Sequence, residues 1–232
     1  MHHGRADKPA LVVFDAAGTT IRDRGEVAAA FTETLAAAGI EVRASEVTAR
    51  RGASKREALA QLVARHFAGL PEDARVGDLY GRFRATLAVK LEGAADLSMP
   101  DAVATFERLK RDHIRIALNS GFDRSILQLI LSRVAWPGGL VDVVVCGEDV
   151  ARGRPAPDMI VTCMERAGVD DAARVAVVGD TRLDMEAGAN AGARYRIGVL
   201  TGAHDRATLE RSPATHIVPS LRAVPGLWSE GT

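Results

Sequence analysis

The amino-acid sequence predicts an α/β protein in which a doubly wound parallel sheet forms a Rossmann-like core and an α-helical cap domain is inserted. Short apolar runs bounded by turn residues recur along the chain, and longer segments of helical periodicity separate them. The runs lack alternation of polar and apolar residues, which is typical of strands buried on both faces of a sheet. The stretch from residue 22 to residue 93 has helical periodicity alone, which predicts an insertion.

Five apolar runs are the predicted strands of the core. Strands that alternate with helices form right-handed crossovers, which predicts parallel neighbours with helices on both faces of the sheet. The segment Thr215–Val218 could add a last strand. The predicted strands are Ala10–Phe14, Ile114–Leu118, Asp142–Cys146, Arg174–Gly179 and Tyr195–Leu200. The predicted core helices are Asp101–Arg111, Arg124–Leu131, Pro157–Ala167, Leu183–Ala191 and Ala207–Arg211.

The inserted stretch contains three predicted helices and no good strand candidate. They are Gly25–Ala38, a helix from Ser54 to about Phe67, and Glu72–Glu92. We therefore expect residues 22–93 to form a helical cap domain. Residues 1–21 and 94–232 are expected to form the Rossmann-like catalytic core.

Composition narrows the class of protein and of partner. Thirty basic and thirty acidic residues cancel, 26% of the 232 residues are charged and 47% are hydrophobic. These values exclude collagenous, disordered and disulfide-rich proteins, and they favour neither nucleic acid nor a membrane as partner. The two cysteines, Cys146 and Cys163, do not make a disulfide framework, and no apolar run is long enough to span a membrane. We expect a cytoplasmic protein, either a monomer or a homodimer.

Polar residues follow four of the predicted strands and are the candidates for chemistry. Asp15 follows the first strand, Ser120 the second, Arg154 lies in the loop beyond the third, and Asp180 and Asp184 follow the fourth. Ligands of open parallel sheets bind outside the carboxyl ends of the strands. Carboxylates suit a magnesium ion, while a guanidinium and small donors suit the oxygens of a phosphoryl group.

Each of these residues has an ordinary structural explanation when it is taken alone. Asp15 could be a helix cap, Ser120 a turn residue, and Arg154 a surface charge. Asp180 and Asp184 could be an N-cap and part of a solvated helix face. The four positions together, each at the same end of a strand, favour a ligand site for a small phosphorylated substrate.

The motifs that contain these residues resemble the haloacid dehalogenase superfamily. The matching segments are FDAAGTT, NSG, GRPAPDM and VVGDTRLDMEAGANAG, in this order along nearly the whole chain. The resemblance implies that Asp15 is a nucleophile that forms an aspartyl-phosphate. It also implies that Asp15, the carbonyl group of Ala17 and Asp180 hold Mg²⁺, with Asp184 in support.

The remaining site residues would contact the phosphoryl group. The resemblance gives this role to Ser120, with Gly121 beside it, and has Arg154 neutralise both the nucleophile and the phosphate. Gly18 allows a tight turn that would point backbone N–H groups at the phosphate, and Thr19 would add a hydroxyl group.

Ala17 stands where most phosphatases of this superfamily have a second aspartate that acts as general acid and base. The subgroup with alanine there is phosphonoacetaldehyde hydrolase, or phosphonatase, whose cap lysine forms a Schiff base with its aldehyde substrate. Lys55 lies close to the corresponding place in this chain. Ala58, three residues later, replaces the histidine that phosphonatase uses for proton transfer. Three roles stay open for Lys55: a solvated surface residue, a substrate contact without an imine, or the Schiff-base residue.

The sequence therefore predicts a magnesium-dependent phosphatase of the phosphonatase-like subgroup that hydrolyses a small phosphorylated metabolite. The alternative is cleavage of a carbon–phosphorus bond through an imine on Lys55. A catalytically silent binding module of the same fold is a third hypothesis, because Ala17 has no proton to give to a leaving group.

Overall fold

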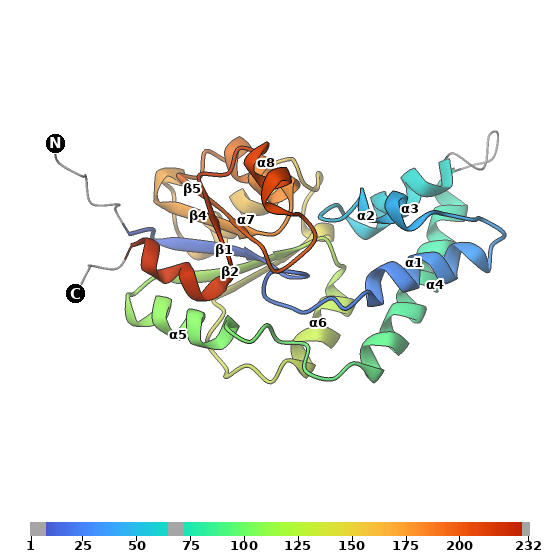
Figure 1. The fold of residues 1–232 in the computed structure, drawn as a ribbon, viewed down its shortest axis with the longest axis horizontal. Helices are drawn as coiled ribbons and strands as arrows, with labels where there is room; N and C mark the ends of the chain where they lie inside the picture. The colour runs from blue at the N-terminus through green and yellow to red at the C-terminus, as the bar shows by residue number, and fades with distance from the viewer. Residues whose placement is uncertain (1–7, 65–71, 229–232) are drawn as a thin grey trace.

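A six-stranded parallel sheet forms the centre of the computed structural model, which describes residues 8–64 and 72–228 (Figure 1). The strand order is β3-β2-β1-β4-β5-β6, so the chain winds outward from β1 in both directions. Every pair of neighbours is parallel. The predicted fold class is confirmed. The strands are β1 (Leu11–Asp15), β2 (Arg115–Ser120), β3 (Val143–Cys146), β4 (Val175–Gly179), β5 (Tyr195–Val199) and β6 (His216–Val218).

Helices cover both faces of this sheet because its strands are apolar on both sides. Alternate residues of β1 point to opposite faces: Val12 and Phe14 pack with Phe106 of α5, whereas Leu11 and Val13 pack against α7 and α8. The free cysteines Cys146 and Cys163 are buried. The core helices are α5 (Ala102–Arg111), α6 (Arg124–Arg133), α7 (Asp158–Ala167), α8 (Arg182–Asn190) and α9 (Arg206–Glu210).

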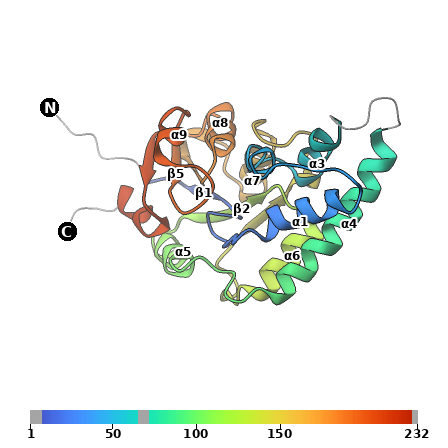
Figure 2. The same cartoon turned by 45° about the vertical axis from the view of Figure 1, so that its right-hand side comes forward.

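The first four of the described helices between β1 and β2 form a separate layer at one end of the sheet (Figures 1 and 2). We name α1 to α4 the helical insertion, and we propose that it is the expected cap domain of residues 22–93. Phe31 of α1 and Phe83 of α4 pack in a tilted arrangement with ring centroids 4.4 Å apart inside its core. Helix α6 of the sheet domain contributes apolar residues to the same cluster. The helices are α1 (Glu26–Ala36), α2 (Ala44–Thr48), α3 (Lys55–Ala64) and α4 (Glu72–Gly93).

The short helix α2 is an element that the sequence reading did not predict. Its five residues are too few to show helical periodicity, and Arg43 and Glu46 close its first turn instead. The predicted end of the following helix near Phe67 lies outside the described residues. Among the described helices, none is both long and apolar enough to cross a membrane.

Local signals fix the helices that border the carboxyl edge of the sheet. Asp123 caps α6 by accepting a hydrogen bond of 2.9 Å from the backbone N–H of Ile126. Thr181 caps α8, and the Asp184 carboxylate accepts a hydrogen bond of 3.0 Å from the Thr181 N–H in return. Such reciprocal caps satisfy the free N–H groups of a first helical turn. Both helices therefore begin at defined positions beside the ends of β2 and β4.

Candidate active site

Three predicted site residues lie together at the carboxyl edge of the sheet. Asp15 is the last residue of β1, Ser120 is the last residue of β2, and Asp180 directly follows β4. Because β1 lies between β2 and β4, Ser120 and Asp180 flank Asp15 on its two sides. All three side chains are buried. The parallel arrangement thus produces one site from three separate segments of the chain.

Arg154 joins the nucleophile candidate to the rest of the site. Its Nη2 atom lies 2.7 Å from Oδ1 of Asp15, and its Nε atom lies 3.1 Å from Oδ1 of Asp184. The same Nη2 donates a hydrogen bond of 2.7 Å to the side-chain oxygen of Asn119. Nη1 donates to the backbone oxygen of Gly52 in the helical insertion, at 3.1 Å. A buried guanidinium with several partners is held rigidly and keeps its charge.

The carboxylates of Asp180 and Asp184 have different partners. Asp180 accepts hydrogen bonds from the Thr19 hydroxyl, at 3.2 Å, and from the Ala203 N–H, at 2.6 Å. Asp184 accepts from the Thr181 hydroxyl at 2.5 Å and is paired with Arg154. Asp184 is therefore placed to support the site from behind, whereas Asp180 lines the cavity in front of Asp15.

The buried carboxylates have the electrostatic character of a cation site. Burial and the negative charges of Asp15 and Asp184 together raise the pKa of Asp180 to about 8. Burial also raises the pKa of Asp15 to about 6, although the charge of Arg154 opposes this. Hard carboxylate oxygens that repel one another are suited to a divalent cation such as Mg²⁺.

The donor set fits Mg²⁺ only if a backbone oxygen takes part. Within residues 8–64 and 72–228, no group of three or more His, Cys, Asp or Glu side chains is arranged to hold a metal ion. Ala17 lines the same cavity as Asp15 and Asp180. The carbonyl oxygen of Ala17 would complete a protein set of three oxygens, with water and substrate as the other ligands, which is common for Mg²⁺.

Gly18 and Thr19 shape the Asp180 side of the site. Gly18 has a φ of +92°, and a Cβ atom there would lie 2.5 Å from Oδ2 of Asp180, so only glycine fits. The N–H of Gly18 donates to the oxygen of Ile21 at 2.8 Å, and the Thr19 hydroxyl donates to Asp180. These contacts differ from the expected contacts with phosphate, and a direct role of either residue in phosphate binding stays a prediction.

A cavity lies between the carboxyl edge and the helical insertion. Its walls combine the carboxylates and Arg154 of the sheet domain with charged residues of the insertion. It is small, so it suits a compact substrate. The lining residues are Asp15, Ala17, Asp23, Val27, Arg51, Gly52, Lys55, Ser120, Gly121, Phe122, Arg154, Asp180 and Thr181.

Lys55, the first residue of α3, points its amine into this cavity. The residue is only 9% exposed, so the solvated alternative for Lys55 is wrong. Its Nζ atom lies 5.0 Å from the centroid of the Phe122 ring and donates a hydrogen bond of 3.4 Å to the oxygen of Ala53. Burial lowers the pKa of Lys55, the charge of Arg154 adds to this, and the charge of Asp15 opposes it. A desolvated amine of this kind is a nucleophile candidate.

The loop before α3 contacts the sheet domain mainly through backbone atoms. The N–H of Lys55 donates to the oxygen of Gly121 at 3.1 Å. A Cβ atom at Gly121 would lie 2.5 Å from the oxygen of Ala53, and one at Gly52, whose φ is +88°, would lie 2.6 Å from Oγ1 of Thr181. Glycine is therefore required on both sides of this contact. Gly121, expected at the phosphate, packs against the insertion; its phosphate contact stays a prediction.

Several residues of the site were not identified from the sequence. Asn119, which holds Arg154, could have been found as a polar residue at the end of a buried strand. Asp23 lines the cavity in an ion pair of 3.0 Å with Arg51, but no motif marks the position of Asp23. Their proximity depends on how the helical insertion packs against the sheet.

Comparison with known proteins gives a consistent result. A family model described as haloacid dehalogenase-like hydrolase matches residues 9–192. The chain is 34% identical over 193 residues to a phosphonoacetaldehyde hydrolase of Latilactobacillus sakei, covering 78% of this chain and 72% of that protein. It is 32% identical over 201 residues to a phosphonoacetaldehyde hydrolase of Paraburkholderia xenovorans, covering 81% and 73%.

Solved structures show the same fold. A phosphonoacetaldehyde hydrolase-like protein from Oleispira antarctica superposes with a TM-score of 0.83 at 22% identity, covering 96% of this chain and 92% of that one. A hydrolase from Pseudomonas syringae superposes with a TM-score of 0.82 at 20% identity, covering 94% and 96%. At these identities, the two structures establish the architecture alone.

Proposed function

This chain belongs to the haloacid dehalogenase-like hydrolases, and within that family we propose that it hydrolyses a carbon–phosphorus bond beside an aldehyde. The substrate class is a small phosphonate whose phosphorus is attached to the carbon next to a carbonyl group. Asp15 would take the phosphoryl group, and Lys55 would hold the carbonyl carbon as a Schiff base. This is the alternative function predicted from the sequence, and the burial of Lys55 favours it over phosphate monoester hydrolysis.

The observation that carries the proposal is a buried amine in the cavity that contains the nucleophile. Lys55 and Asp15 line one small cavity. Ala17 lines the same cavity, but its side chain has no acidic proton to give to an alcohol leaving group. A phosphate monoester with a poor leaving group needs such a proton. A phosphonate aldehyde instead needs an acceptor for the electron pair of the breaking carbon–phosphorus bond, which an iminium on Lys55 provides.

The residues at the sheet edge would carry the phosphoryl group. Arg154 lies against Asp15 and would offset the repulsion between that carboxylate and the phosphonate oxygens. Ser120 would donate a hydrogen bond to one of these oxygens. When bound by Asp15, Asp180 and the Ala17 carbonyl, Mg²⁺ supplies further positive charge on the phosphoryl oxygens. The chemistry requires mainly in-line positioning and neutralised charge, which a rigid buried site supplies.

The residues of the cap side would carry the carbon fragment. The neutral Lys55 amine attacks the aldehyde carbon, and uptake of one proton with loss of water leaves a C=N bond with nitrogen protonated. Asp15 then forms a bond to phosphorus while the carbon–phosphorus bond breaks. The electron pair of the broken bond moves toward the iminium nitrogen, which produces an enamine. Protonation of the enamine carbon and hydrolysis release the aldehyde and restore the amine. Water then hydrolyses the aspartyl-phosphate to free phosphate.

The curated relatives support this proposal. The proteins from Latilactobacillus sakei and Paraburkholderia xenovorans that this chain resembles over more than 70% of their length are phosphonoacetaldehyde hydrolases. Phosphonoacetaldehyde, for which they are named, has an aldehyde group that a buried lysine could attack and a phosphonate group that the phosphoryl site could bind.

Phosphate monoester hydrolysis is the second candidate, and one observation favours it. Ala58 is buried in the apolar core of the helical insertion. Its methyl side chain cannot transfer the proton that imine formation requires. An enzyme without that step would use Asp15 alone, on substrates whose leaving groups need little protonation.

The deciding experiment measures phosphate release with and without Mg²⁺ from phosphonoacetaldehyde and from a panel of phosphate monoesters. The proposal expects turnover of the phosphonate, loss of that turnover in Lys55→Ala, and trapping of wild-type Lys55 by borohydride, located by peptide mass spectrometry. Asp15→Asn controls for contaminating enzymes. Turnover of monoesters alone, with Lys55→Ala only partly impaired, would establish the phosphatase instead.

A further inference from the structure

Imine formation at Lys55 requires a group that moves protons between the amine nitrogen and the carbonyl oxygen. Neither Ala17 nor Ala58 has a titratable side chain. We propose that Asp23 performs this proton transfer, an inference that rests on the proposed function. Asp23 lies outside every motif described above, in the segment that leads from β1 to α1.

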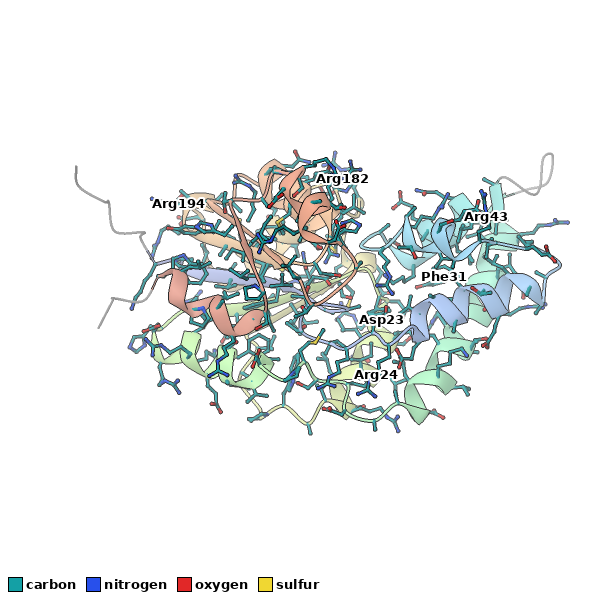
Figure 3. The ribbon with its side chains drawn as sticks, in the orientation of Figure 1. Asp23, Arg24, Phe31, Arg43, Arg182 and Arg194 are labelled. Carbon is teal, nitrogen blue, oxygen red and sulfur yellow. The ribbon has the colours of Figure 1, made fainter. Side chains whose placement is uncertain are left out.

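The position of Asp23 fits the role. It lies where the chain passes from the sheet domain to the helical insertion (Figure 3). Its side chain, only 9% exposed, lines the same cavity as Lys55. The Oδ1 atom accepts a hydrogen bond of 2.9 Å from the N–H of Gly25. The Oδ2 atom lies 3.0 Å from Nη2 of Arg51. Each oxygen therefore has one partner, and an ionised carboxylate has further lone pairs for a substrate proton.

The charge of Asp23 acts directly on the Lys55 amine. Asp15, Asp23 and Asp180 favour the ammonium form of Lys55, whereas burial and the charge of Arg154 disfavour it. Asp23 is thus one of the charged groups that face the amine. A carboxylate in that position is ready to receive the proton that nitrogen must lose.

The other carboxylates of the cavity have separate tasks. Of the described residues that line it, Asp15, Asp23 and Asp180 are the carboxylic acids. Asp15 must attack phosphorus, and Asp180 is fixed by Thr19 and Ala203 on the side where Mg²⁺ would bind. Asp23 is left for proton transfer on the carbonyl side.

The proposed step balances as follows. The lone pair of Lys55 Nζ forms a bond to the carbonyl carbon, and the π electron pair of the carbonyl group moves to its oxygen. Asp23, which first takes one proton from the Lys55 ammonium group, gives that proton to the oxygen, so that the oxygen becomes a hydroxyl group, and then accepts a second proton from nitrogen. It then returns a proton to that hydroxyl, which leaves as water as the C=N bond forms. Asp23 ends in its original ionised form, still paired with Arg51.

A purely structural role for the Asp23–Arg51 ion pair is the competing explanation, since it joins the β1–α1 segment to the loop before α3. Asp23→Asn retains the shape of the side chain and its oxygen for Gly25, but not the basicity. We expect Asp23→Asn to lower kcat for phosphonoacetaldehyde by about 10²-fold or more, and to slow borohydride trapping of Lys55 in proportion. Binding of inorganic phosphate with Mg²⁺, measured by calorimetry, should be unchanged.

Further variants separate chemistry from structure. The smaller Asp23→Ala should regain activity when formate is added, which a lost structural contact would not do. Glu26→Gln changes a nearby carboxylate that does not line the cavity and should behave as wild type.

The outcomes are distinguishable from those of the proposed function. Trapping of Lys55 in wild type and at an equal rate in Asp23→Asn would overturn the role of Asp23 and leave the Schiff base intact. Failure of wild type to form any trapped adduct would overturn both. Slow trapping in Asp23→Asn without formate rescue of Asp23→Ala would make the ion pair structural and the proposal wrong.

Discussion

Among single residues, Ala17 has the most direct influence on which bond the site can break. Its side chain lines the cavity next to Asp15 but carries no proton. A missing general acid slows reactions with poor leaving groups and leaves those with good leaving groups nearly unchanged. The position therefore separates the two candidate functions by chemistry rather than by binding.

Replacing Ala17 with aspartate should supply the missing general acid. Ala17→Asp is expected to raise kcat for an alkyl phosphate monoester by roughly 10²-fold, because the new carboxyl group can protonate the leaving oxygen. The rate with p-nitrophenyl phosphate, whose leaving group needs little protonation, should change by less than about threefold. Ala17→Asn is the matched control. Equal gains on both substrates would contradict the acid–base explanation.

The pKa shifts of the buried carboxylates predict how metal binding depends on pH. Burial raises the pKa of Asp180 to about 8, so between pH 4 and pH 8 the folded protein binds more protons than the unfolded chain. The stability of the metal-free protein should therefore fall as the pH rises through this range. Mg²⁺ competes with those protons, so its stabilising effect should increase over the same range.

Thermal unfolding with and without Mg²⁺, from pH 5 to pH 8, tests this expectation. At a Mg²⁺ concentration one hundred times the Kd, the ion should add about 2.7 kcal/mol to the free energy of unfolding. Asp180→Asn should abolish most of that gain. A Mg²⁺-induced shift in Tm that is the same at every pH would show that Asp180 is already ionised in the metal-free protein.

At the scale of elements, the loop before α3 fixes where the Lys55 amine lies. Gly52 contacts Thr181 at the start of α8, and Gly121 after β2 contacts Ala53. The loop thus contacts the segments that follow two strands, β2 and β4, at the carboxyl edge of the sheet. A displacement of this loop would move Lys55 out of the cavity without unfolding either part of the molecule.

Gly52→Ala is expected to impair turnover much more than folding. A side chain there would lie 2.6 Å from Thr181 Oγ1, and the φ of +88° is itself strained by about 1–2 kcal/mol for a residue other than glycine. We expect kcat/KM to fall by roughly 10-fold or more. Gly39→Ala is the control, because its φ of +75° carries similar strain but nothing lies within 4 Å. Equal loss of activity in both variants would refute the contact.

The strands and part of the site could be predicted from the sequence. Apolar strands buried on both faces are visible in sequence because period and composition are local, and the edge of a parallel sheet then gathers Asp15, Ser120 and Asp180. The burial of Lys55 was not predictable, since lysine at a first helical turn is usually solvated. Asp23 was also missed, because its place in the cavity results from packing between distant segments.

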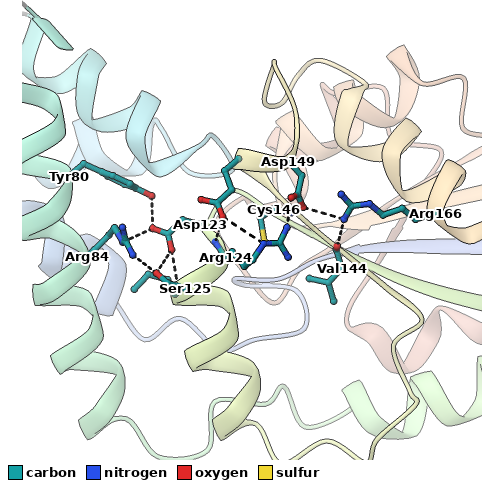
Figure 4. A network of polar contacts seen from close by, with 11 residues as sticks. Tyr80, Arg84, Asp123, Arg124, Ser125, Val144, Cys146, Asp149 and Arg166 are labelled. Carbon is teal, nitrogen blue, oxygen red and sulfur yellow. Dashed lines mark hydrogen bonds and ion pairs between the residues drawn. The ribbon is translucent and has the colours of Figure 1, made fainter. Parts of the chain in front are cut away.

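For the whole molecule, a polar network joins the helical insertion to the sheet domain (Figure 4). The Tyr80 hydroxyl of α4 donates a hydrogen bond of 2.9 Å to Asp123, and Arg84 lies 2.9 Å from the same carboxylate. Burial alone would raise the pKa of Asp123, but hydrogen bonds from Ile126, Ser125 and Tyr80 and the charge of Arg84 hold it low. Asp123 follows Phe122, which contacts Lys55, so this network borders the site.

Asp123→Ala should weaken both the cap of α6 and the attachment of α4. The lost cap costs about 1 kcal/mol, and the lost hydrogen bond from Tyr80 and ion pair with the half-exposed Arg84 add to it, for a total of about 2–3 kcal/mol. A Tm lower by roughly 5–10 °C is expected for a chain of this size. Tyr80→Phe removes one hydrogen bond and should cost about 1 kcal/mol. Equal Tm values for the two variants would contradict the central role of Asp123.

The contacts between the loop of Gly52 to Lys55 and the sheet domain have a consequence for divergence within the family. Arg154 binds the backbone oxygen of Gly52, and the N–H of Lys55 binds the backbone oxygen of Gly121. Main-chain atoms are present whatever the side chain. Provided that the glycines stay, neighbouring positions of the insertion can therefore change over evolutionary time, and new substrates can be selected, while the join between the two parts of the molecule is preserved.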